Sequence, residues 1–312
     1  MLHPRPVLGL PQACPRSVPA AAARVAAARL AVARLPGPGT FVAAVPRSFV
    51  AAPGAVKKAA AGRSPPPHGR SPAPMSPETG TLSDSAVLDN PVWAALTGTH
   101  RAFAELGPTG LAGRYASDTS PFAALRDPED PAAWADLAAL VGPGQEVWVT
   151  GLPTPPADWE TLMTVPGVQL DGRGVRAEAA PEAVPLGRGD VPEMLELVGL
   201  TRPGPFLDRT VELGTYLGIR HGGRLVAMAG ERMRPAGWSE ISAVCTHPDH
   251  RGRGLAGRLT RAVAAAVRER GDNPFLHAAA ANTGAVRLYE SMGFTVRRRP
   301  VFLGLRTPAA GA

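Results

Sequence analysis

The residues best suited to chemistry lie in one turn, where two residue types recur: Arg251, Gly252, Arg253, Gly254, Gly257 and Arg258. Glycine lets the backbone approach a ligand closely or adopt a positive φ, and arginine supplies a permanent positive charge that suits phosphate oxygens. We expect a strand over residues 239–246 to enter this turn and a helix over residues 254–270 to leave it. Because the first amides of that helix would have no partner within it, the turn is expected to bind phosphate or pyrophosphate.

The turn taken alone is a moderately specific signal. Strand, glycine-rich turn and helix also follow one another in dinucleotide-binding folds. The chain has no G-x-x-x-x-G-K-[ST] loop, which disfavours nucleoside triphosphate hydrolysis. The alternative interpretation is purely structural: the turn is a solvated, arginine-rich segment whose glycines serve only as helix caps.

Two motifs resemble those of the GNAT-type N-acetyltransferases. Residues 251–256, RGRGLA, resemble the family's (Gln/Arg)-x-x-Gly-x-(Gly/Ala) signature, and Pro248 stands in the turn that precedes it. Further on, Asn282 is followed seven residues later by Tyr289 and then by Gly293 and Phe294, as in the family's second motif. The resemblance covers residues 184–305, and the segments EISAVCT and LHA are most similar to the subgroup related to glycine N-acyltransferases.

The resemblance implies a site for acetyl-CoA and roles for its residues. The Val244 N–H would polarise the thioester carbonyl, and the backbone around it would pair with the pantetheine arm. Tyr289, two turns along the helix from Asn282, would act as general acid toward the sulfur. The implied cofactor-binding residues are Val244, Cys245, Thr246, Arg251, Gly252, Arg253, Gly254, Leu255, Ala256, Gly257 and Asn282.

The general base is left open among three candidates. Glu240 lies at even spacing from Val244 on the same expected strand, and so on the same side of it. His277 occupies the position five before Asn282, where some members of the resembled family carry a catalytic Glu, and the reference pKa of histidine suits the task. Water is the third candidate, and Glu240 is favoured. Each residue also has a structural alternative: Tyr289 in the core, Asn282 as a helix cap and Glu240 as an ion-pair partner.

Two further readings of the segment around Cys245 are disfavoured. Cys245, His247 and His250 lie close together, but no second group of metal ligands accompanies them, so we expect no metal. No histidine is placed by a motif to activate Cys245, and the resembled family transfers the acyl group directly. A covalent acyl-cysteine is therefore not expected.

The elements that position these residues indicate an α/β (α+β) fold. Between residues 183 and 307 the pattern predicts the order β-α-β-β-β-α-β-α-β, a mixed, mostly antiparallel GNAT-like sheet flanked by helices. Residues 83–180 are predicted to form a smaller α/β domain of unknown role. That domain is expected to hold helices over 91–106, 131–141 and 159–163, and strands over 146–152 and 168–170.

The first 82 residues are predicted to be a disordered leader rich in Ala, Pro and Arg. Ten of the 33 basic residues lie in residues 1–77, which hold no acidic residue, so the other 23 and the 26 acidic residues give residues 78–312 a net charge of −3. The leader would be a targeting peptide, a basic helix that seeks a surface, or, as we favour, a segment outside the working protein, which would then start at Met75.

Together these features predict an enzyme that moves an acetyl or short acyl group from acyl-CoA to a primary amine of a small molecule or peptide, by direct attack in a ternary complex. The alternatives are a non-catalytic acyl-CoA-binding sensor and a nucleic-acid-associated factor acting through the leader. The mildly acidic folded part disfavours nucleic acid, and the lack of a long apolar stretch disfavours a membrane. With two cysteines, a reducing cytosol is the expected compartment.

Overall fold

The computed structural model describes residues 85–151 and 153–309, which all belong to one compact unit, Pro67–Ala312. The predicted leader, residues 1–82, lies outside the described residues. The helices, with η marking a 3₁₀ helix, are η1 (Ala86–Asp89), α2 (Pro91–Thr97), η2 (Arg101–Phe103), α3 (Pro131–Val141), η3 (Arg188–Asp190), α4 (Val191–Thr201), η4 (Thr210–Leu213), η5 (Pro248–His250), α5 (Leu255–Glu269) and α6 (Thr283–Ser291). The strands are β1 (Ala104–Leu106), β2 (Ala112–Tyr115), β3 (Phe122–Leu125), β4 (Glu146–Gly151), β5 (Glu160–Asp171), β6 (Val184–Leu186), β7 (Tyr216–His221), β8 (Arg224–Glu231), β9 (Trp238–Thr246), β10 (Asn273–Ala279), β11 (Thr295–Arg298) and β12 (Val301–Arg306).

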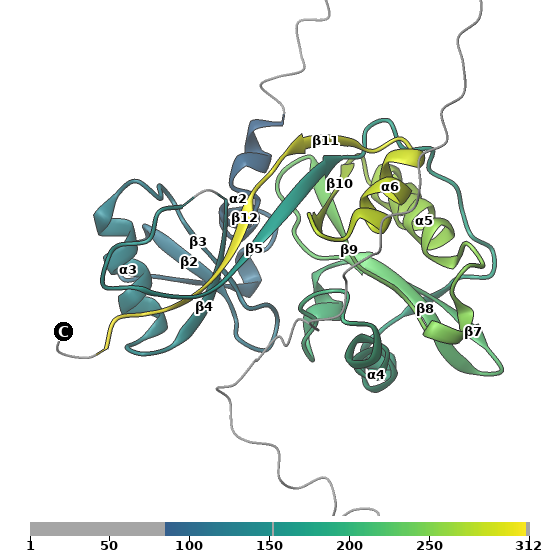
Figure 1. Ribbon diagram of the computed structural model, residues 1–312, viewed down its shortest axis with the longest axis horizontal. Helices are drawn as coiled ribbons and strands as arrows, with labels where there is room; N and C mark the ends of the chain where they lie inside the picture. The colour runs from purple at the N-terminus through teal and green to yellow at the C-terminus, as the bar shows by residue number, and fades with distance from the viewer. Residues whose placement is uncertain (1–84, 152, 310–312) are drawn as a thin grey trace, which may run out of the picture. The chain divides into compact units, whose positions relative to one another are not determined.

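The predicted fold class is confirmed. The strands form one mixed sheet in the order β1-β2-β3-β4-β12-β5-β10-β9-β8-β7-β6, with β11 paired beside β5 (Figure 1). Most neighbours are antiparallel; among the described strands, the parallel pairs are β3 with β4 and β9 with β10. Each parallel pair is joined by a helix, α3 in the first case and α5 in the second, as parallel pairing requires a crossover.

Strand β5 continues from one part of the sheet into the other. Its residues 160–166 pair with β12, and its residues 167–171 pair with β10. Strand β12, although last in the chain, therefore lies between β4 and β5. The division into an N-terminal domain over 83–180 and a GNAT domain over 183–307 stays a prediction. Strands of the two parts pair with each other across the proposed boundary, β12 with β4 and β5 with β10.

Two expected helices differ from the structure. The helix predicted over 91–106 ends at Thr97, where Gly98 follows, and the rest forms η2 and β1. The helix predicted over 159–163 is wrong, because residues 160–163 begin the long strand β5. Thr161 among them is β-branched and pairs with Leu305 of β12 on the sheet.

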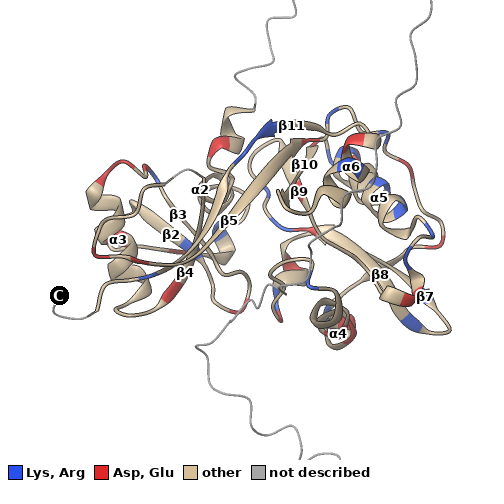
Figure 2. Ribbon diagram, in the orientation of Figure 1, with Lys and Arg blue, Asp and Glu red and all other residues tan. Residues whose placement is uncertain are grey.

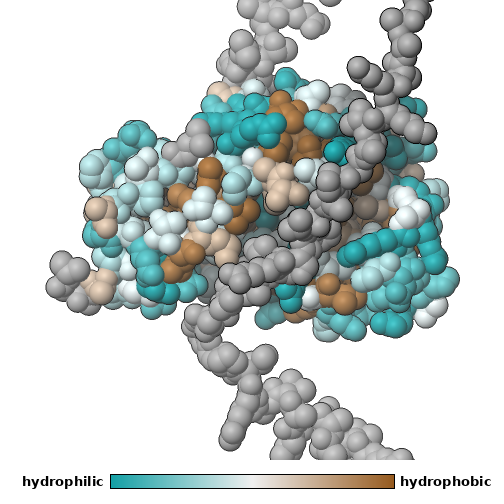
Figure 3. Space-filling view, viewed as in Figure 1, coloured by the Kyte–Doolittle hydropathy of each residue, from teal (hydrophilic) through white to brown (hydrophobic). Residues whose placement is uncertain are grey.

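Helices cover the sheet on both faces around β9. On one face, α5 and α6 pack Leu259, Val263 and Tyr289 against Ile241 and Leu276. On the opposite face, α4 packs against the β7–β9 strands through a cluster that includes Met194, Met228 and Cys245, and Trp238 and Phe275 pack against α2 and β3. On the face shown in Figure 3, hydrophobic residues form separate small patches. Every described helix is too short or too polar to traverse a lipid bilayer.

Candidate active site

Strand β9 carries an irregularity at the point where it leaves its parallel neighbour. Pairing with β10 ends at Ile241 opposite Leu276. The register with β8 then jumps from Ser242 to Cys245, and Ala243 adopts a φ of 53°. Ala243 and Val244 consequently have no register partner on either neighbouring strand of the described chain. This part of β9 offers backbone groups to an extended ligand, as strand addition requires.

The glycine-rich turn follows β9 and opens directly into α5. Gly252 and Gly254 have φ values of 75° and 74°, which only glycine adopts without strain. Gly254 caps the helix without any side-chain hydrogen bond. Within the described chain, the amides of residues 252–257 donate no hydrogen bond. They form an open N-terminus suited to a diphosphate, with Leu255 itself turned into the core and contributing its main chain.

The arginines of the turn lie at the surface beside these amides. Arg251 donates from Nε to the carbonyl of Thr246 at 3.4 Å, and Arg253 donates to the carbonyl of Asp249 at 3.3 Å. Neither has an ion-pair partner among the described residues, and both are exposed. Both remain available to an anionic ligand, whereas Arg258 pairs with Glu182 at 3.2 Å.

Helix α6 presents the two residues of the second motif. The Asn282 side chain caps the helix by accepting from the Ala285 amide at 3.2 Å, which is the structural role named as its alternative. Tyr289 is 8% exposed and packs edge-to-face on Phe294. Burial, with a smaller contribution from Cys245, raises the pKa of Tyr289 to about 12. Its hydroxyl is therefore protonated at neutral pH, and its ring packs in the same cluster as Ile241 of β9 and Leu276 of β10.

Glu240 is enclosed in a polar network on the face opposite α5. Both of its carboxylate oxygens accept from the Arg232 guanidinium, at 2.7 and 2.9 Å, and Oε1 also accepts from His277 at 2.8 Å. Burial alone would raise the pKa of Glu240, but Arg232 and His277 outweigh it and lower the pKa to about 2. The carboxylate is 0% exposed, so it is a weak base with little access to a substrate.

The hydrogen bonds around His277 fix its tautomer. Arg297 donates to the Gln169 carbonyl oxygen, so the Gln169 amide nitrogen is a donor, to the Leu88 carbonyl and to His277 Nε2 at 3.1 Å. His277 Nε2 therefore carries a lone pair, and the proton lies on Nδ1, directed at Glu240. Both ring nitrogens are occupied, which leaves no free position for proton abstraction from a substrate.

Cys245 and Thr246 end β9 in different environments. Cys245 is 6% exposed, and burial raises the pKa of its thiol to about 11, so it stays protonated at neutral pH. Thr246 has a buried hydroxyl with no hydrogen-bond partner in the described chain. No group of three or more potential metal ligands occurs among the described residues.

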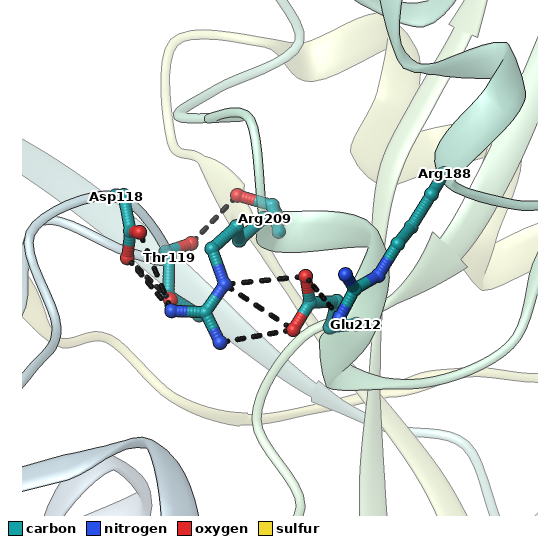
Figure 4. Close-up of polar contacts among 6 residues, drawn as sticks. Asp118, Thr119, Arg188, Arg209 and Glu212 are labelled. Carbon is teal, nitrogen blue, oxygen red and sulfur yellow. Dashed lines mark hydrogen bonds and ion pairs between the residues drawn. The ribbon is translucent and has the colours of Figure 1, made fainter.

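The loop before β7 is held by ion pairs. Arg209 lies between Glu212, at 3.0 Å, and Asp118, at 3.3 Å, and Glu212 also pairs with Arg188 (Figure 4). Thr210 adds a hydrogen bond to the Thr119 carbonyl. Arg209 and Glu212, which had no assigned role in the sequence, therefore fasten this loop to the β2–β3 connection. Elsewhere, basic residues gather on β11 and acidic ones on α4 (Figure 2).

Two residues of the network, Gln169 and Arg232, lack any motif in the sequence, and so does the nearby Tyr216. The signal that could have found Arg232 is a charge in an apolar hairpin, since Arg232 and Glu240 end up opposite one another across the β8–β9 turn. Gln169 and Tyr216 belong to strands distant from β9 in sequence, so only the fold brings them to it.

Comparisons with known proteins agree with this geometry. The FR47-like protein family matches residues 216–303, from the start of β7 into β12. A crystal structure of a GNAT-family protein from Novosphingobium aromaticivorans, described as an acetyltransferase, is 41% identical. It matches 71% of this chain and 99% of that chain with a TM-score of 0.65. The chain belongs to the GNAT family of acetyltransferases.

A second relative matches a shorter segment. The mycothiol acetyltransferase of Thermobispora bispora is 45% identical over 83 residues, which are 26% of this chain and 27% of that enzyme. The matched segment thus spans about a quarter of that relative's length. It supports the family and leaves the acceptor substrate to be inferred from the site itself.

Proposed function

We propose that this protein transfers an acetyl group from acetyl-CoA to a primary amine by direct attack in a ternary complex. The observation that carries the proposal is the set of uncommitted amides at residues 252–257, next to the stretch of β9 that has no pairing partner. The turn would hold the diphosphate, with Arg251 and Arg253 beside it. The backbone at Val244 would receive the thioester carbonyl and stabilise the oxyanion that forms on attack.

Tyr289 would assist departure of the thiolate. A thiol has a pKa of about 8.5, well below the pKa of about 12 of Tyr289. The departing sulfur would therefore not remove this proton outright, and a hydrogen bond from the hydroxyl is the stabilisation that Tyr289 provides as the C–S bond breaks. The protonated Cys245 thiol suits direct transfer, since it is a poor nucleophile.

From the sequence, Glu240 was favoured as the general base. Its hydrogen bonds and burial in the structure favour a different role. A carboxylate with a pKa of about 2 and three occupied hydrogen-bonding positions gains little by taking a proton from an amine. Glu240 would instead hold Arg232 and His277 in place beneath the reacting centre. The amine would lose its proton to water, which was the third candidate for the general base and requires no further side chain.

The main rival is an acyl-CoA sensor that binds without turnover. Tyr289 favours the enzyme, because a protonated hydroxyl near the end of β9 has no use in binding alone. The likeness of EISAVCT and LHA to the subgroup of glycine N-acyltransferases stays a proposal, as do a short acyl chain other than acetyl and a place in the cytosol.

The test uses the purified full chain with acetyl-CoA and a panel of primary amines, from amino acids to aromatic amines and peptides. Thiol release is followed with a thiol reagent, and each product is identified by mass spectrometry. We expect thiol release that depends on the amine and a matching acetylated product. Tight binding of acetyl-CoA without thiol release for any amine would favour the sensor.

A further inference from the structure

The hydroxyl of Tyr216 is buried without a hydrogen-bond partner in the described chain. The residue is 1% exposed, and its burial raises the pKa of the phenol, so the group is a neutral hydroxyl. A second tyrosine with 1% exposure, Tyr115, has its hydroxyl bonded to His100 Nδ1 at 3.0 Å. An unpaired buried hydroxyl lowers stability, so its presence beside a reactive centre points to a ligand that pairs with it.

The ring of Tyr216 reaches from β7 toward the irregular part of β9. Tyr216 pairs with Gly230, where a Cβ would come within 2.2 Å of the ring, so the ring lies across this glycine. Gly230 in turn pairs with Ser242, the residue before the irregularity at Ala243. Ser242 lies two residues after Glu240 on β9, so the two side chains face the same side of the sheet. Tyr216 is therefore on the same face of the sheet as Glu240.

The geometry of a carbonyl decides which face the amine uses. A thioester carbonyl that accepts a hydrogen bond from the β9 backbone does so near its own plane. Its two reactive faces then point above and below the sheet. One of these sides is packed with α5 and α6, including Tyr289. The other side is covered by α4 and α2, but it holds the unpaired Tyr216 hydroxyl, so we place the amine on that side.

We propose that the Tyr216 oxygen accepts a hydrogen bond from the N–H of the acceptor amine and so orients its lone pair toward the carbonyl. This inference rests on the proposed acetyltransferase function. The surroundings also indicate the acceptor class. Tyr216 packs among Phe206, Val211 and Met228, and the charge of Glu240 is compensated by Arg232. A primary amine carried on an apolar group fits this environment, and a polycation does not.

The test compares Tyr216→Phe with the matched substitution Tyr115→Phe, both in the full chain. For Tyr216→Phe we expect a roughly tenfold lower kcat/KM for the amine, the upper end of what one hydrogen bond contributes, an unchanged Kd for acetyl-CoA and a higher unfolding midpoint. For Tyr115→Phe, which loses a bonded hydroxyl, we expect a lower unfolding midpoint and an unchanged kcat/KM. Apolar amines should also outperform polyamines with the unsubstituted protein.

The outcomes separate the two proposals. If the unsubstituted protein acetylates no amine, the proposed function fails and the role of Tyr216 fails with it. If it acetylates amines and Tyr216→Phe does so within twofold of the same kcat/KM, only the role of Tyr216 is overturned. A preference for polyamines would overturn the acceptor class.

Discussion

The described chain contains two similar arrangements of strands, each with one crossover helix. The two arrangements differ at the N-terminus of that helix. In the first, β1, β2 and β3 are antiparallel neighbours and α3 connects β3 to its parallel partner β4. In the second, β7, β8 and β9 are antiparallel neighbours and α5 connects β9 to its parallel partner β10. In the sheet, β4 of the first arrangement is followed by β12, and β10 of the second arrangement is followed by β5 (Figure 1).

The helix N-termini are treated in opposite ways. At α3, Asp130 accepts from the Ala132 amide at 2.8 Å, Pro131 has no N–H, and Asp127 accepts from the Glu129 amide. At α5, Gly254 provides no side chain and the first amides have no partner. The same crossover is therefore closed by its own carboxylates in one place and open to an anion in the other.

This difference shows that the crossover alone does not make an anion site. A cavity of about 350 Å³ lies beside the carboxyl ends of β3 and β4, lined in part by Ala124, Val149 and Glu129. Carboxylates of the α3 turn stand where a diphosphate would have to bind. Acyl-CoA chemistry is expected only at β9 and α5, and the predictions below test this assignment.

The largest effect is expected from giving α5 the cap that α3 has. In Gly254→Asp a carboxylate would stand near the diphosphate. Two unit charges 4 Å apart at an effective dielectric of about 20 repel by about 4 kcal/mol, so we expect affinity for acetyl-CoA to fall by about 1,000-fold. Calorimetric titration measures this. Gly254→Asn, which imposes the same backbone cost without charge, should lose much less; an equal loss in both variants would contradict the electrostatic explanation.

The second prediction concerns Tyr289, which has no counterpart after β4. Strand β10 is followed by α6, whereas residues 153–159 after β4 form no helix. Removing one hydrogen-bond donor to a developing negative charge costs about 10²–10³-fold, so Tyr289→Phe should lower kcat by about 100-fold or more. Its Kd for acetyl-CoA should change little, because the turn proposed to bind the diphosphate is untouched. A Kd that rises as much as kcat falls would instead assign Tyr289 to binding.

Much of this comparison was accessible from the sequence. The alternation of glycine and arginine predicted the open N-terminus of α5, and the helices predicted over 131–141 and 254–270 are found as α3 and α5. These features depend on residues within one or two turns of each other, which the sequence displays directly.

Contacts between distant segments were beyond the sequence. The enclosure of Glu240 requires Arg232 from the preceding hairpin and His277 from β10, and His277 is in turn held by Gln169 of β5. From the sequence Glu240 was therefore favoured as the base, and the structure instead shows the ion-pair partner named as its alternative. The strand β5 was also missed over residues 159–163, because its pairing partner β12 lies about 140 residues further along the chain.

The third prediction concerns the contact between the two arrangements. His100 bonds to Tyr115 of β2 and to the Leu213 carbonyl before β7, and burial lowers its pKa to about 4. The unfolded chain binds this proton near pH 6.5 and the folded chain does not, so stability is highest above pH 6.5 and falls as the pH drops toward 4. The loss should reach about 3 kcal/mol at pH 4. Urea unfolding from pH 7 to 4 measures it.

A substitution identifies the group responsible for this pH dependence. His100→Gln keeps a donor and an acceptor without a titrating ring, so its stability should fall less steeply over the same pH interval. Glu240 contributes in the same direction only at lower pH, since its folded pKa of about 2 lies below its ordinary value and its stabilisation is lost as the pH falls below about 4.5. If His100→Gln lost stability between pH 6.5 and 4.5 as steeply as the unsubstituted chain, another group would be responsible.

The smallest effect is expected from opening α3 as α5 is open. Asp130→Ala removes the hydrogen bond to the Ala132 amide and should lower the free energy of unfolding by about 1 kcal/mol, the usual cost of losing an N-cap. Urea unfolding measures this, and calorimetric titration should show unchanged affinity for acetyl-CoA. If Asp130→Ala created a second binding event for acetyl-CoA, the carboxylate cap alone would be what separates the two crossovers. A single event would mean that other features of this turn, such as Pro131, which lacks an amide hydrogen, also prevent binding.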